Sequence, residues 1–188
     1  KVVIEFFELA SPNDFVFLTI SRLVAVKNIS LQIKALAKLE NKNVKLIIAG
    51  DGPEKANLQN LARELKIEDK IIFAGWIDNL SGYYKSADCL LLSSNSEGYG
   101  MIVAEAVLVG LPVIMTDVGV AGELVEDNSN GLIVPINNQE LFAQAMSKVV
   151  EDKELLQKFS VNSKLFTNKI LNKQELINKV VDNWKTIL

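Results

Sequence analysis

Two basic side chains that could hold a phosphate group stand together near the start of the sequence. Arg22 and Lys27, five positions apart, follow the apolar run Val16–Ile20. A planar guanidinium and a compact ammonium can bind the same pyrophosphate, and a helix expected directly after Asn28 would add unpaired backbone N–H groups. The pair indicates a diphosphate-binding loop. Two solvated basic residues, the commoner outcome for such a pair, are the alternative.

Two carboxylates occupy a later segment that is rich in small residues. Glu97 follows the apolar run Cys89–Leu92, and Glu105 comes after seven further residues, within an otherwise apolar stretch. An ionised carboxylate there is costly unless hydroxyls or cations satisfy it. Gly98 and Gly100 leave backbone N–H groups approachable where a helix should begin, and an anion is favoured there. A sugar nucleotide, which carries hydroxyls and phosphates, would suit this set. Two structural glutamates, one capping the loop and one in a salt bridge, are the alternative.

Two other segments follow apolar runs. Residues 75–78 read Gly-Trp-Ile-Asp, and Trp76 can pack on a nucleobase or cover the neighbouring helix, which is the commoner arrangement. Residues 50–53 read Gly-Asp-Gly-Pro, the composition of a simple turn at a helix start. We therefore expect a structural role for Asp51.

The composition excludes several other chemistries. The 188 residues contain no histidine and one cysteine, Cys89, which excludes a Ser-His-Asp triad, histidine-ligated metals and a cysteine-built zinc site. A net charge of −3 gives no basic surface for nucleic acid. The first loop lacks the glycines of a dinucleotide-binding fingerprint. No targeting segment is recognisable, and with the single cysteine this predicts a cytoplasmic protein.

The elements that position these residues follow from the alternation of short apolar runs and amphipathic segments. This alternation predicts a Rossmann-like three-layer α/β/α domain, with a mostly parallel sheet of about six strands followed by C-terminal helices. In such sheets ligands bind at the carboxyl ends of the strands, near the point where strand order reverses. The strands are expected at 16–20, 44–49, 70–74, 89–92, 112–115 and 131–134, and the helices at 29–39, after Pro53, at 81–86, at about 100–109 and after Asn138.

Finer expectations concern helix ends, buried stripes and boundaries. Asn28 is expected to cap the first helix. Residues 1–14 are expected to be an N-terminal segment or the remnant of an interdomain linker, 15–170 the nucleotide-binding domain and 171–188 a C-terminal helix. Because the sequence lacks an initiator methionine, we expect a fragment. The expected stripes are Leu58, Leu61, Ala62 and Leu65 in the second helix, Leu141, Ala145 and Val149 after Asn138, and Ile177, Val180, Val181 and Trp184 at the end.

Taken together, the loops resemble a known family. The segments SRLVAVKN, LIIAGDGP, IIFAGWI, ADCLLLSSNSEGYGMIVAEAVLVGLPVI and NGLIVP lie between about Phe15 and Asp152. Their order and spacing resemble the C-terminal, donor-nucleotide domain of retaining glycosyltransferases of the GT-B fold, of the group 1 or family 4 type. Ser21 stands where many members have glycine, a small departure.

The resemblance implies roles for individual residues. It implies that Arg22 and Lys27 bind the donor diphosphate, that Glu97 contacts sugar hydroxyls and that Glu105 contacts ribose hydroxyls. The catalytic set it implies is Arg22, Lys27 and Glu97. It places Trp76 and Ile77 near the base. Backbone groups near the sugar and phosphates would come from Gly98, Tyr99, Gly100, Met101 and Ile102.

The same resemblance implies a function for the chain. It describes the lobe of a glycosyltransferase that binds a nucleoside-diphosphate sugar and transfers the sugar to a glycan, lipid or other acceptor. Neither a metal nor a cofactor is implied. The partner is the missing N-terminal acceptor domain, without which the chain is expected to be inactive. Peripheral association of the full-length enzyme with the inner face of the membrane is left open. The alternatives are a non-catalytic nucleotide-binding module and, on the same fold, a sugar-nucleotide epimerase or a phosphorylase.

Overall fold

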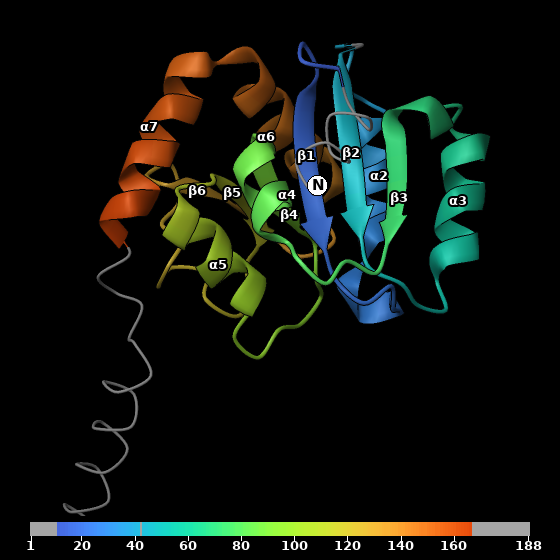
Figure 1. Cartoon of the computed structure of the whole chain (residues 1–188), viewed down its shortest axis with the longest axis horizontal. Coiled ribbons are helices and arrows are strands. Elements are labelled where there is room, and N and C mark those ends of the chain that lie inside the picture. The colour runs from blue at the N-terminus through green and yellow to red at the C-terminus, as the bar shows by residue number, and fades with distance from the viewer. Residues whose placement is uncertain (1–10, 42, 167–188) are drawn as a thin grey trace, which may run out of the picture.

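A computed structural model describes residues 11–41 and 43–166. Its centre is one sheet of six strands, all parallel, in the order β3-β2-β1-β4-β5-β6 (Figure 1). This confirms the predicted Rossmann-like α/β domain. The strands are β1 (Phe15–Ile20), β2 (Val44–Ala49), β3 (Ile71–Gly75), β4 (Cys89–Leu92), β5 (Val113–Thr116) and β6 (Gly131–Val134).

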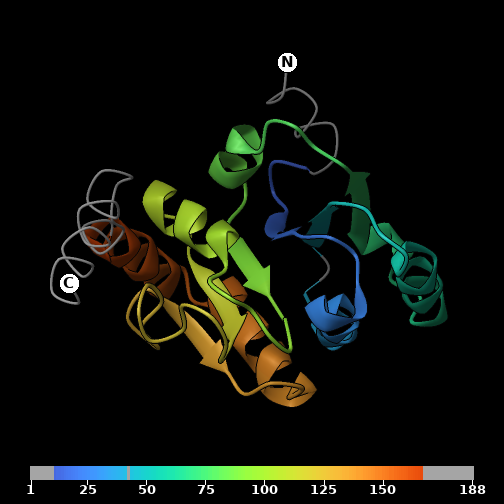
Figure 2. The same ribbon diagram turned by 90° about the horizontal axis from the view of Figure 1, so that it is seen from below.

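Helices cover both faces of this sheet. One face packs on α2 (Ile29–Leu36), α3 (Lys55–Glu64) and α6 (Gln139–Glu151), and the other packs on α4 (Ser81–Ser86) and α5 (Met101–Val109) (Figure 2). The last described helix, α7 (Lys153–Leu165), contacts both α5 and α6. Two short 3-10 turns, η1 (Ala25–Lys27) and η2 (Glu68–Lys70), complete the elements.

The strands are continuous apolar runs because both of their faces are buried. In β1, Phe17 enters the cluster on the α2 side, and Leu18 enters the cluster on the α5 side. Both side chains are fully buried. The one polar residue within β1, Thr19, is also buried, so it must find a hydrogen-bond partner inside the protein.

Strand order reverses beside β1. The chain runs from β1 outward through β2 to β3, then crosses back and places β4 on the other side of β1. A parallel sheet opens a crevice at such a reversal, outside the carboxyl ends of the strands. The loops after β1 and β4 meet at this crevice, and they are the loops that carry Lys27 and Glu97.

Several local predictions differ from the structure. The first helix ends at Leu36 rather than at residue 39. Asn28 occupies the N-cap position as predicted, but its backbone is left-handed and its side chain makes no cap hydrogen bond, because its amide bonds to other loops. Leu65 lies beyond the end of α3 and is exposed. Leu141 is also exposed, because the buried stripe of α6, with Phe142, Ala145, Met146 and Val149, is centred further round the helix.

The expected C-terminal helix at 171–188 lies outside the described residues, as does most of the N-terminal segment 1–14. No helix within 11–41 and 43–166 has both the length and the apolar content needed to cross a membrane.

The corrected stripe of α6 makes a testable prediction. Phe142→Ala should lower the free energy of unfolding by about 3–5 kcal/mol, because it removes a fully buried ring and leaves a cavity. Its neighbour Leu141, 41% exposed, is the matched control, and Leu141→Ala should cost less than about 1 kcal/mol. Urea unfolding of both variants measures the difference. Equal losses of unfolding free energy in the two variants would contradict the assignment of Phe142 to the buried stripe and of Leu141 to the exposed face.

Candidate functional site

The loop that follows β1 is held by close packing against the loop that follows β2. The backbone N–H of Leu23 donates to the Asp51 carbonyl, and the N–H of Glu54 donates to the Leu23 carbonyl. A Cβ atom on Gly50 would lie 1.9 Å from the Ser21 carbonyl oxygen, so only glycine permits this approach. The segment 50–53 is thus the structural turn expected, and it fixes the backbone on which Arg22 stands.

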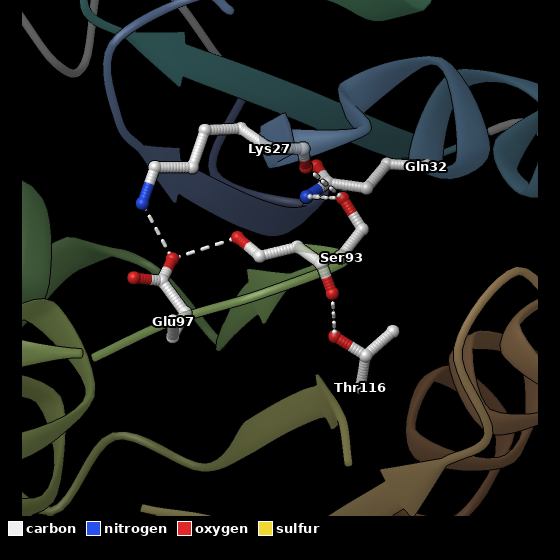
Figure 3. Close-up of polar contacts among 6 residues, drawn as sticks. Lys27, Gln32, Ser93, Glu97 and Thr116 are labelled. Carbon is white, nitrogen blue, oxygen red and sulfur yellow. Dashed lines mark hydrogen bonds and ion pairs between the residues drawn. The ribbon is translucent and has the colours of Figure 1, made fainter. Parts of the chain in front are cut away.

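Lys27 and Glu97 meet at the reversal of strand order. The Lys27 Nζ lies 2.5 Å from Glu97 Oε1, although the two residues are 70 positions apart (Figure 3). Their side chains are 24% and 11% exposed, so this ion pair is largely shielded from water. The Ser94 hydroxyl donates to the same Glu97 oxygen at 2.7 Å. The phosphate-binding lysine and the sugar-binding glutamate that the sequence predicts separately are therefore in direct contact.

Direct hydrogen bonds also join the two loops that carry this pair. The Asn95 N–H donates to the Val26 carbonyl at 2.8 Å. The Asn28 amide donates to the side chains of Asn95 and Asn137, which brings in the loop after β6. Asn28 has a φ of 47°, a left-handed conformation that asparagine tolerates better than most residues. These bonds make the edge of the sheet one connected surface.

The start of α5 lies next to Glu97 in the chain. Gly100 occupies the N-cap position with a φ of 86° and provides no side-chain cap, so the first turn of α5 can offer N–H groups to an anion. Gly119, in the loop after β5, packs closely here, since a Cβ on it would lie 2.8 Å from the Tyr99 carbonyl oxygen. Tyr99 and Met101 have exposed side chains, and Ile102 is half-buried.

Glu105 is separate from the ion pair and has a phenol as its partner. The Tyr84 hydroxyl donates to Glu105 Oε2 at 2.8 Å. Burial, followed by the hydrogen bond and the charge of Glu105, raises the pKa of Tyr84 well above its ordinary value, so the phenol stays a neutral donor. This answers the need for a hydroxyl partner near Glu105. The sequence pattern did not single out Tyr84, which lies on α4.

Arg22 and Trp76 extend from the same edge without contacting the pair. Within the described ranges Arg22 forms no ion pair, and its side chain is exposed. The Trp76 indole is 78% exposed and donates to Asp78 Oδ1 at 2.9 Å. Of the two arrangements considered for Trp76, covering a neighbouring helix does not occur, because the ring lies in solvent. Ile77, next to it, is half-buried in the apolar cluster on the α5 side.

A cavity of about 520 Å³ lies at the opposite end of the sheet. Its lining includes Phe15, Asp88 and Pro112, which lie at the amino ends of β1, β4 and β5. It lacks Arg22, Lys27, Glu97 and the start of α5. We place the candidate site at the carboxyl ends because a charged pair, a helix start and a crossing of strand order coincide there.

Comparison with known proteins agrees with this fold. The lobe architecture is that of GT-B glycosyltransferases: a crystal structure of HepE from Anabaena, in complex with UDP and glucose, superposes with a TM-score of 0.88 at 23% identity. The match covers 98% of this chain and 52% of HepE. The family model for glycosyl transferases group 1 matches residues 3–166, and the chain belongs to this family.

Relatives in other organisms are similar over most of this chain. An uncharacterized glycosyltransferase of Methanocaldococcus jannaschii is 34% identical over 143 residues, which are 74% of this chain and 37% of the relative. The N-acetyl-alpha-D-glucosaminyl L-malate synthase of Bacillus anthracis is 28% identical over 178 residues, 94% of this chain and 46% of the relative. The chain thus spans less than half the length of these two relatives.

A buried hydroxyl at the site yields a stability prediction. Ser21 Oγ is buried and has no hydrogen-bond partner among the described residues, so Ser21→Ala should change the free energy of unfolding by no more than about 0.5 kcal/mol. Thr116 Oγ1, by contrast, donates to the Ser94 carbonyl at 2.6 Å. Thr116→Val leaves that carbonyl unpaired and should cost about 1–3 kcal/mol. Denaturant unfolding compares the two, and equal destabilisation would mean that the Ser21 hydroxyl has a bonded partner after all.

Proposed function

We propose that this chain is the donor-binding lobe of a retaining, metal-independent glycosyltransferase. The lobe binds a nucleoside-diphosphate sugar, and the full protein transfers the sugar to a glycan, lipid or other acceptor. The observation that carries the proposal is the shielded Lys27–Glu97 pair at the reversal of strand order, beside the uncapped start of α5. Membership of the glycosyl transferases group 1 family and the UDP bound by HepE support it.

The diphosphate is assigned to Arg22, Lys27 and the first turn of α5. An ammonium has three donors, so Lys27 can keep one on Glu97 and give another to a phosphate oxygen. Arg22 has an exposed side chain and a planar fork of donors that suits a phosphate. Together they provide counter-charge without a bound metal ion.

The hydroxyl groups of the ligand are assigned to the two glutamates. Glu97 receives both of its contacts, from Lys27 and Ser94, at Oε1. The second carboxylate oxygen has lone pairs for the hydroxyls of the donor sugar. Glu105 takes the ribose hydroxyls in this proposal, with Tyr84 holding its carboxylate. Trp76, whose exposed indole follows β3, and Ile77 lie near the base.

The reaction step follows from where charge develops. When the bond between the sugar and the diphosphate breaks, negative charge grows on the departing diphosphate. Arg22, Lys27 and the α5 start stabilise that charge where it appears, and in comparable sites one such donor contributes about 2.7–4 kcal/mol. Retention of configuration rests on the resemblance to retaining enzymes. The acceptor is assigned to another part of the full-length protein, in keeping with the greater length of the relatives.

Diphosphate binding tests the proposal directly. Calorimetry with excess chelator should show that the chain binds UDP, GDP or ADP. We expect this because Arg22 and Lys27 supply the positive charge that a metal ion would otherwise provide. Arg22→Ala should lower the affinity for the diphosphate about ten- to a hundred-fold and leave the affinity for the corresponding nucleoside nearly unchanged. Arg63→Ala is the control, because Arg63 lies on α3 and its guanidinium donates to the Asn60 side chain. Loss of all binding under chelation would refute metal independence, and equal losses for nucleoside and diphosphate would refute the role of Arg22.

The two glutamates should affect different parts of the ligand. Glu97→Gln should weaken binding of a sugar nucleotide by about ten- to a hundred-fold, because the carboxylate that faces the sugar hydroxyls loses its charge. Binding of the plain diphosphate should weaken far less, because it lacks those hydroxyls and the glutamine amide oxygen can still accept a hydrogen bond from Lys27. Glu105→Gln should lower the affinity for both ligands to a similar degree, because both ligands contain ribose. Calorimetry of two ligands against two variants gives the comparison. The assignment of Glu97 to the sugar fails if both ligands weaken equally in Glu97→Gln.

A further inference from the structure

A chain of buried polar groups runs from the sheet to the backbone of Lys27. The Thr19 hydroxyl on β1 donates to Gln32 Oε1. Gln32 Nε2, on α2, donates to Ser93 Oγ at 2.9 Å. Ser93 Oγ, just after β4, lies 2.9 Å from the carbonyl oxygen of Lys27 (Figure 3). It lies at the same distance from the carbonyl oxygen of Asn28. All three of these polar side chains are at most 2% exposed.

The direction of this chain of hydrogen bonds is fixed by its end. A carbonyl oxygen can only accept, so the single proton of Ser93 must point to the Lys27–Asn28 backbone. Ser93 must then accept from Gln32, which requires the NH₂ group of the amide to face Ser93. The amide oxygen of Gln32 is left for Thr19, whose hydroxyl must donate. Each group therefore depends on the one before it.

Direct hydrogen bonds within the protein satisfy these buried groups. Thr19, Lys27, Gln32 and Ser93 also help to line a small cavity of about 10 Å³, which is at the lower edge of the roughly 10–15 Å³ that one water molecule needs. Each of the three polar side chains is bonded to another protein group, so removing one partner leaves a buried polar group without its protein hydrogen bond.

Gln32 is an unusual choice for its place in the fold. The other buried residues of α2 are all apolar: Ile29, Leu31, Ile33, Ala35 and Leu36. An apolar side chain would satisfy packing there, whereas a buried amide is costly unless it is fully hydrogen-bonded. The chemistry of Gln32 thus serves the loop that carries Lys27 rather than the core itself.

A second arm of the same design holds Glu97. The Thr116 hydroxyl, at the end of β5, donates to the carbonyl of Ser94, and the Ser94 hydroxyl donates to Glu97 (Figure 3). Lys27 and Glu97 are therefore each attached to one of two consecutive serines at the end of β4. The relative place of the two charged groups is set by the backbone of Ser93 and Ser94.

We propose that Gln32 and Ser93 are positioning residues that hold the Lys27 backbone so that its ammonium lies beside Glu97, at the place of the donor diphosphate. Neither side chain touches the ligand in this arrangement. The inference rests on the proposed function only in taking the diphosphate as the ligand of Lys27. The hold on the loop exists without any ligand and can be measured without one.

A double-mutant cycle tests whether Ser93 acts through Lys27. Calorimetry with UDP compares Ser93→Ala, Lys27→Met and the double variant. Ser93→Ala alone should lower the affinity for UDP about ten-fold. In the Lys27→Met background the same substitution should change that affinity less than about two-fold. Ser163→Ala is the matched control, since Ser163 is a fully buried serine that donates to the Asn130 carbonyl, far from these loops in the chain. Equal losses from Ser93→Ala in both backgrounds would overturn the proposal.

Amide hydrogen exchange of the ligand-free chain is the second arm. In the wild type the Lys27 and Asn28 N–H groups donate to the Val24 and Ala25 carbonyls. Ser93→Ala should speed their exchange about ten-fold or more, and Gln32→Leu should speed it to a smaller extent, while Ser163→Ala leaves it unchanged. If the wild type binds no nucleotide, the proposed function fails, and this arm still decides whether the network holds the loop. Unchanged exchange in both Ser93→Ala and Gln32→Leu would overturn the inference.

Discussion

An ion pair between two loops is the interaction on which the rest of this edge depends. Lys27 and Glu97 are largely withdrawn from water, and charged groups in such places are costly unless each is held against its partner. The protein meets this demand with short hydrogen bonds to the carboxylate and to the lysine backbone. The loops after β1 and β4 therefore act as one assembly. If Lys27 or Glu97 moved far, the other charged group would lose its ion-pair partner.

Backbone proximity is the second constraint. Gly50 permits the loop after β2 to lie directly on the Ser21 carbonyl, and Gly119 permits the loop after β5 to lie on the Tyr99 carbonyl. Side chains at these positions would separate the loops. The candidate site is thus formed by loops in van der Waals contact, supported from below by polar side chains at the ends of β1, β4 and β5. The rigid sheet provides the frame, and the hydroxyls transmit its geometry to the charged groups.

The sequence was sufficient for the elements and for the edge of the sheet where the candidate residues lie. Apolar runs such as Cys89–Leu92 identify buried strands because burial on both faces leaves no polar alternation. Sequence pattern could not supply the Lys27–Glu97 contact, which depends on strand order. Nor could it supply the role of Gln32, which is one of three polar residues in α2, together with Ser30 and Lys34. The error at Leu141 arose because spacing alone does not say where a stripe is centred. The ligand roles of Arg22, Lys27, Glu97 and Glu105 stay predictions.

The left-handed backbone of Asn28 has a consequence for sequence variation. A φ of 47° favours glycine, asparagine and aspartate, and side-chain crowding makes a β-branched residue an outlier there. The position after Lys27 is therefore biased toward this small group of residues, even though Asn28 contacts no ligand in the proposed scheme. In a divergent chain that keeps the lysine, a valine or isoleucine at the next position would mark a loop that has lost this geometry. The identity of this one neighbour thus reports on the integrity of the site across relatives.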